Sequence, residues 1–60
     1  MRILIDGTEC KAEGTILSSV VSMGKDPDSY IYLIDGVPVP SDSSPPEDAM
    51  VKAVRVASGG

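Results

Sequence analysis

The chain has 60 residues, of which 42% are hydrophobic, and five basic and nine acidic side chains give it a formal net charge of −4. A domain of this length buries roughly 60% of the surface of its unfolded chain, so we expect one domain with a small core. Its longest apolar run has five residues, which is short of the about 20 that a membrane-spanning helix needs and of a secretory signal. A single cysteine cannot form an internal disulfide, and without histidine the chain lacks the usual zinc ligand and general base.

The acidic balance argues against nucleic-acid binding, which needs a basic patch. We therefore expect a small cytoplasmic domain that binds no membrane, metal or cofactor and is not an enzyme on its own.

The first segment, 1–5, alternates apolar and other side chains, which predicts a strand. Leu4 lies on the face opposite the core, and the core-facing side chains are Met1, Ile3 and Ile5. The Asp6-Gly7 dipeptide is a strong signal for a hairpin turn. The polar segment 8–13, which contains Cys10, then predicts a short second strand at the edge of a sheet.

A helix of two to three turns is predicted after Thr15, whose hydroxyl can cap the first turn. Gly24 stands where a left-handed residue would end this helix. Apolar residues at helical spacing are expected to face the sheet, namely Ile16, Leu17, Val20 and Val21. Serines are expected to face solvent, namely Ser18, Ser19 and Ser22.

Three further strands are predicted after the turn at 25–29. Segment 30–34 is apolar at every position, so we expect both of its faces to be covered inside the sheet. Asp35-Gly36 predicts a second hairpin, and segment 37–40 suits only an edge strand because it has two prolines. Segment 41–49 predicts a loop with no second helix, and segment 50–57 predicts the last strand.

This order, β-β-α-β-β-β, predicts an α+β fold in which one helix lies across a mixed sheet of four or five strands. The first and last strands are expected side by side, parallel and central, which is the β-grasp arrangement. We expect residues 1–57 to form the domain and residues 58–60 a flexible tail.

The tail ends in Gly59-Gly60, directly after a strand. A flexible end is the simplest interpretation of two terminal glycines. However, a tail without Cβ atoms can also thread a narrow slot and present its carboxylate to a reagent. A carboxylate becomes a good electrophile only after activation, for instance as an acyl-adenylate. The chain has no glycine-rich phosphate loop, so a partner enzyme would have to supply ATP chemistry.

These features resemble the ubiquitin-like sulfur carriers, and most of all the small archaeal ubiquitin-like modifiers. The resemblance is carried by the segments 34–40 (Ile-Asp-Gly-Val-Pro-Val-Pro) and 51–56 (Val-Lys-Ala-Val-Arg-Val) before the terminal glycines. The thiamin-pathway sulfur carrier and the small subunit of molybdopterin synthase are less similar. Segment 41–49 departs from the family pattern, because it is rich in proline and lacks the usual helical or apolar stretch.

The resemblance implies a β-grasp fold and adenylation of Gly60 by an E1-like enzyme that uses ATP and magnesium. The product is either a thiocarboxylate, which donates sulfur to an acceptor in cofactor synthesis or tRNA thiolation, or an isopeptide bond to a lysine of a target protein. The free protein would be a monomer. The alternative is a non-catalytic subunit, similar to the small subunit of molybdopterin synthase, whose tail inserts into the active site of a partner enzyme.

Alternation along the strands also predicts a partner-binding face on the side without the helix. Its centre is expected at Leu4, Leu33 and Val54, flanked by Ile31 and Val56. Residues near the tail that could orient a partner are Lys52, Arg55 and Ser58. A one-residue error in register would turn the whole set inward.

Other candidate sites have simple structural interpretations. We expect Cys10 to be an ordinary thiol, because nothing beside it except Lys11 would activate it. Tyr30 and Tyr32 are expected to pack in the core rather than stack on bases. Carboxylates without the spacing of a calcium loop are expected in solvated turns, namely Asp26, Asp28, Asp42, Glu47 and Asp48.

Overall fold

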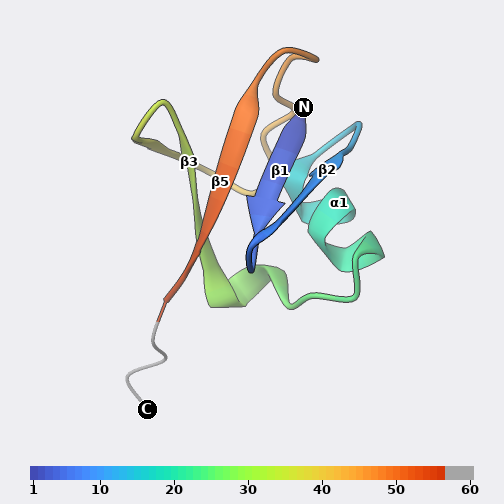
Figure 1. Cartoon of the computed structure of the whole chain (residues 1–60), viewed down its shortest axis with the longest axis vertical. Helices are drawn as coiled ribbons and strands as arrows, with labels where there is room; N and C mark the ends of the chain where they lie inside the picture. The colour runs from blue at the N-terminus through green and yellow to red at the C-terminus, as the bar shows by residue number, and fades with distance from the viewer. Residues whose placement is uncertain (57–60) are drawn as a thin grey trace.

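The computed structural model, which describes residues 1–56, contains one mixed sheet with a helix packed on one of its faces (Figure 1). The strands are β1 (Arg2–Ile5), β2 (Thr8–Lys11), β3 (Tyr30–Ile34), β4 (Val37–Val39) and β5 (Met50–Arg55). The helix is α1 (Ile16–Ser22), and a single 3-10 turn, η1 (Pro27–Ser29), precedes β3. The strand order is β2-β1-β5-β3-β4, with β1 and β5 parallel and the other pairs antiparallel. The predicted β-grasp arrangement is confirmed.

Two turns of the same kind close the hairpins. Asp6 and Gly7 have φ angles of 50° and 79°, and Asp35 and Gly36 have φ angles of 52° and 78°. Positive φ at both central residues is the requirement of a type I′ turn, whose twist matches that of the flanking strands. Aspartate tolerates this conformation and glycine adopts it freely, so both hairpins form where the Asp-Gly dipeptides predict them.

The polar loop 41–49 satisfies the first turn of α1. The Thr15 hydroxyl accepts a 3.1 Å hydrogen bond from the Ser18 amide, as predicted for the cap. The amides of Ile16 and Leu17 have no partner within the helix, and they donate to the carbonyls of Ser43 and Ser41 at 3.1 and 2.8 Å. A helix leaves its first amides without intrahelical acceptors, so this loop fixes the N-terminal end of α1.

The face of α1 that meets the sheet is narrower than predicted. Ile16 and Val20, four positions apart, are fully buried, whereas Leu17 and Val21 are 40% and 56% exposed. A helix of seven residues touches the sheet along one stripe, and the next residue along is rotated by about 100°. The predictions for Leu17 and Val21 are therefore wrong.

Ser19, predicted to face solvent, is buried instead. Its hydroxyl oxygen lies 2.9 Å from the carbonyl oxygen of Thr15 and 3.2 Å from that of Glu13, and the single hydroxyl proton is shared between these two acceptors. Burial of a hydroxyl is tolerated when it is hydrogen-bonded, and these two bonds explain why a serine occupies the inner stripe.

Between α1 and the sheet lies a core of eight buried side chains: Met1, Ile3, Ile5, Ile16, Val20, Tyr30, Tyr32 and Val51. The two tyrosine rings pack in this core, as expected, with centroids 6.4 Å apart. Their hydroxyls reach its rim, where Tyr30 donates to Asp6 and Tyr32 donates to the Pro27 carbonyl, each at 2.7 Å. The core therefore buries aromatic surface without leaving a phenol unsatisfied.

The expectation that both faces of β3 are covered is wrong for one face. β3 does lie inside the sheet, between β5 and β4. Tyr30 and Tyr32 point to the core, but Ile31 points away from α1 and is 47% exposed.

In the part of the chain that the structure describes, no helix is long and apolar enough to cross a membrane.

Candidate functional site

The sheet face opposite α1 brings together side chains from three adjacent strands. In the register of β3, β5 and β1, Leu33 lies opposite Lys52, and Lys52 lies opposite Leu4. Directly paired residues project to the same side of a sheet, so these three form one row across its centre. We call this side the helix-free face and define its centre as Leu4, Leu33, Lys52, Ile31 and Val54.

Ile31 and Val54 form an exposed apolar pair at the centre of the helix-free face. They are direct cross-strand partners, and 47% of Ile31 and 39% of Val54 remain accessible to solvent. Leu4 and Leu33 are half-buried beside them. A contiguous apolar area of this kind is more informative than isolated exposed side chains, because it often marks a site of contact with a partner.

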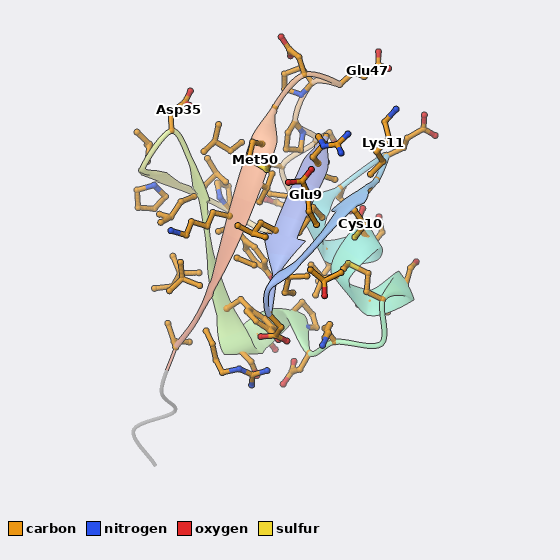
Figure 2. The ribbon with its side chains drawn as sticks, viewed as in Figure 1. Glu9, Cys10, Lys11, Asp35, Glu47 and Met50 are labelled. Carbon is orange, nitrogen blue, oxygen red and sulfur yellow. The ribbon has the colours of Figure 1, made fainter. Side chains whose placement is uncertain are left out.

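Charged side chains form the rim of the helix-free face on the side of β2. Glu9 lies opposite Leu4, and Lys11 lies opposite Arg2. Arg2 Nε donates to Glu9 Oε2 at 2.6 Å, and a little under half of each side chain is exposed. Met50 on β5 pairs with Arg2 and lies at the same end of the sheet as Lys11 (Figure 2). Lys52 and Lys11 have no ion pair among residues 1–56.

The structure does not bring Arg55 together with this set. Arg55 lies opposite Tyr30 and therefore on the side of the helix, where its guanidinium carbon is 5.1 Å from the centroid of the Tyr30 ring. Its Nη2 donates to the Tyr30 hydroxyl at 2.9 Å and lies 3.3 Å from Asp6 Oδ2. Val56 follows β5 and is half-buried, and its amide donates to the carbonyl of Ser29 at 2.9 Å.

Asp6 is the centre of a small charged cluster where β1 ends and β3 begins. Its carboxylate accepts from Tyr30 and pairs with Lys25 at 3.0 Å and with Arg55. The hydrogen bond from Tyr30 and the neighbouring cations lower the pKa of Asp6 to about 2. The same contacts with Asp6 raise the pKa values of Lys25 and Tyr30 above their ordinary values. The sequence indicates the turn at Asp6 but not this cluster, because its members are distant in the chain.

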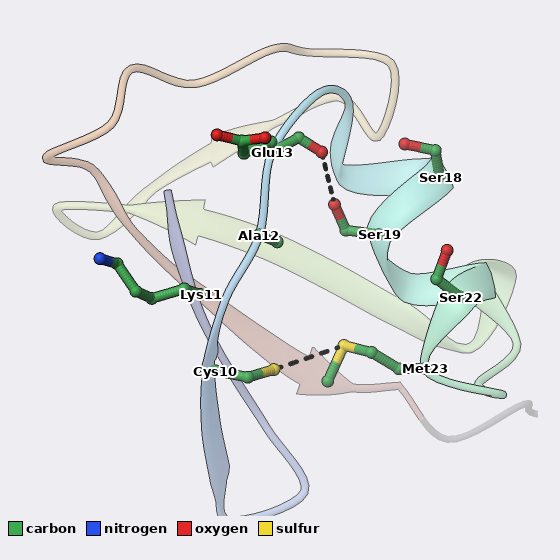
Figure 3. Close-up of a pocket in the computed structure, with 8 residues that line it drawn as sticks. All are labelled: Cys10, Lys11, Ala12, Glu13, Ser18, Ser19, Ser22 and Met23. Atoms are coloured by element: carbon green, nitrogen blue, oxygen red, sulfur yellow. Dashed lines mark hydrogen bonds between the residues drawn. The ribbon is translucent and has the colours of Figure 1, made fainter.

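A shallow hollow of about 250 Å³ lies between β2 and α1 (Figure 3). Cys10 points into it, and its Sγ lies 3.7 Å from Met23 Sδ. The hydrogen bond from Ser19 to the Glu13 carbonyl closes its other end (Figure 3). Within residues 1–56 no three side chains of the kinds that bind metals come together. The hollow therefore has one thiol beside a thioether and no set of metal ligands.

Three of the predicted site residues, Ser58, Gly59 and Gly60, lie outside the described residues.

Comparison of the chain with protein-family models, with curated proteins and with solved structures gives no match. Among the predicted site residues that are described, the helix-free face is thus the one place where several meet.

Proposed function

We propose that this chain is a ubiquitin-like sulfur carrier or protein modifier, activated at the carboxylate of Gly60 by an E1-like adenylating enzyme. The observation that carries the proposal is the exposed apolar pair of Ile31 and Val54 on the helix-free face. This pair lies on β3 and on β5, the strand that leads toward Gly59-Gly60. Docking on this face would hold the enzyme beside the strand from which the glycines continue.

The chemistry in this proposal belongs to the terminal carboxylate and to the partner. A carboxylate oxygen of Gly60 attacks the α-phosphorus of ATP, and pyrophosphate leaves as the acyl-adenylate forms. Hydrosulfide then attacks the acyl carbon, AMP leaves, and the lost proton yields a thiocarboxylate. In the alternative fate a lysine amine attacks the same carbon, AMP leaves, and an isopeptide bond forms after loss of a proton. ATP and magnesium are bound by the enzyme, and the chain itself is not a catalyst.

Intact-mass measurement tests the proposal. The mass of the protein purified from its own cells first checks that Gly60 carries the free carboxylate. The full chain is then incubated with the E1-like adenylating enzyme of the same organism, ATP, magnesium and sulfide. We expect release of pyrophosphate and a mass increase that corresponds to the replacement of one oxygen by sulfur. A chain without Gly60 should give neither product.

Two controls separate chemistry from folding. The chain without Gly60 should keep the circular dichroism spectrum and melting temperature of the full chain, because a terminal residue contributes little to a core. Gly59→Ala should slow activation more than it changes stability, because its Cβ crowds a narrow slot. If Gly60 gains neither sulfur nor a lysine adduct in vitro or in cells, the carrier proposal fails. The non-catalytic docking subunit then takes its place.

A further inference from the structure

The charges of this acidic protein are distributed unevenly over its surface. The helix-free face carries three of the five basic side chains, namely Arg2, Lys11 and Lys52, and one acidic side chain, Glu9. Its net charge is therefore +2. The rest of the chain has two basic and eight acidic side chains and therefore a net charge of −6, so the two parts together have the net charge of −4 of the whole chain. A basic face on an acidic protein favours a partner of negative charge.

Lys52 has a special position on this face. It is exposed, and its direct neighbours across the sheet are the half-buried Leu33 and Leu4, so its ammonium group rises from an apolar row. A partner that covers these leucines also removes water from the lysine. Loss of hydration from an unpaired ammonium is costly, and the cost is offset only when the partner supplies an opposite charge or hydrogen-bond acceptors.

The geometry points to an acidic, apolar docking surface on the partner, with a carboxylate that pairs with Lys52. This inference rests on the proposed function, because the partner is the E1-like adenylating enzyme. The apolar part of its surface covers Ile31 and Val54, and its carboxylates face Lys52 and the rim at Lys11. Such a surface aligns the partner with β5 through one central ion pair and a ring of weaker attractions.

A second copy of the chain fits this face less well. Two helix-free faces placed against each other bring together two net charges of +2, and the one carboxylate on each face, that of Glu9, already pairs with Arg2 of the same copy. The face of one copy against the acidic remainder of another remains electrostatically favourable. If copies of the chain associated in this way, the free protein would self-associate more strongly at low salt than at high salt, and light scattering of the free protein measures this rival outcome.

The experiment measures binding without chemistry. The full chain and the chain without Gly60 are titrated onto the immobilised E1-like enzyme of the same organism, without ATP, between about 50 and 500 mM salt. Lys52→Gln should weaken binding about 5- to 10-fold at low salt, and about 2-fold at high salt, where charges are screened. Lys52→Arg should bind within about 2-fold of the wild type, because it keeps the charge.

The matched control is Ser44→Asp, which changes the net charge by the same −1 in the exposed part of the loop that bonds to the first turn of α1, on the helix side of the sheet. It should leave binding within about 2-fold of the wild type, because it is remote from the contact. Equal effects of Lys52→Gln and Ser44→Asp would reduce the inference to a general charge effect and overturn it. Salt-independent binding, absence of binding, or self-association through this face in place of enzyme binding would also overturn it.

Failure of the inference and failure of the proposed function give different results. If the chain is adenylated at Gly60 but Lys52→Gln binds normally, the acidic docking surface is wrong and the carrier proposal stands. If binding depends on Lys52 and salt, also without Gly60, but Gly60 is never modified, the docking surface stands and the carrier proposal fails.

Discussion

The Tyr30 hydroxyl donates a 2.7 Å hydrogen bond to the Asp6 carboxylate, which ties the first hairpin turn to the start of β3. Lys25 and Arg55 add ion pairs to the same carboxylate from the segment after α1 and from the end of β5. Three segments distant from the first hairpin thus converge on the Asp6 side chain, close to the point where β5 ends. Exposed ion pairs are individually weak, so the hydrogen bond and the convergence matter more than any single pair.

Asp6→Asn is expected to lower the melting temperature at neutral pH. The folded carboxyl has a pKa of about 2 against an ordinary value of 3.8, so the ionised group stabilises the fold above about pH 4. This contribution is lost as the pH falls from 4 toward 2, and the two melting curves should converge there. Thermal melts at several pH values measure the difference.

The matched control for this prediction is Asp35→Asn. Asp35 occupies the same place in the second type I′ turn, with a φ angle of 52° against 50° for Asp6, and it has no ion pair among residues 1–56. Asparagine tolerates this conformation as well as aspartate does. Equal losses in the two variants would mean that the turn, and not the cluster at Asp6, is responsible.

Ile3→Val tests the core against the helix-free face. Ile3 is fully buried, and removal of one methylene group should lower the free energy of unfolding by about 1 kcal/mol. Ile31→Val makes the same change on the opposite face of the sheet, where the side chain is 47% exposed, and should stay within about 0.5 kcal/mol of the wild type. Urea unfolding at equilibrium measures both, and a larger loss at Ile31 would contradict the assignment of the two faces.

Ser19→Ala should destabilise the protein although alanine favours helices. The substitution leaves the Glu13 carbonyl without the hydroxyl that it accepts from, at a cost of about 1 kcal/mol. The higher helix propensity of alanine offsets part of this, about 0.5 kcal/mol. Ser22→Ala is the control, because Ser22 is exposed and only the gain in propensity remains. A melting temperature of Ser19→Ala at or above that of Ser22→Ala would contradict the role given to Ser19.

Local signals were sufficient to predict most of the fold. The two Asp-Gly turns, the Thr15 cap and the period-2 pattern of the strands depend on neighbours in sequence, and each lies where predicted. The parallel pairing of β1 and β5 follows from the single helix between the first hairpin and the later strands.

Features that depend on tertiary contacts could not be predicted in the same way. The helical period does not tell how wide the contact of α1 with the sheet is, so the pattern predicts Leu17 inward and Ser19 outward, whereas Leu17 is exposed and Ser19 is buried. Arg55 is expected to orient a partner because it lies near the tail in the sequence, but the register pairs it with Tyr30 on the side of the helix. Alternation alone identifies the shared face of Leu4, Leu33 and Val54, because a period of 2 leaves one choice once the core face is known.

The helix-free face gives the last prediction, which concerns activation by the E1-like enzyme. Leu33→Asp places a carboxylate beside Lys52 and removes apolar surface from the centre of the face. We expect the affinity for the enzyme, measured by titration, to fall about 10- to 100-fold, as for a central interface residue. Leu17→Asp is the matched control, because Leu17 is 40% exposed in the first turn of α1, where a carboxylate is tolerated.

The half-buried position of Leu33 requires a second variant, because Leu33→Asp could unfold the domain. Ile31→Asp alters a more exposed residue of the same face, opposite Val54, and should keep the wild-type circular dichroism spectrum. If folded Ile31→Asp protein binds the enzyme and is adenylated as fast as Leu17→Asp protein, the helix-free face is not the docking site. If both face variants lose binding while Leu17→Asp keeps it, the enzyme contacts the sheet on the side that α1 leaves open.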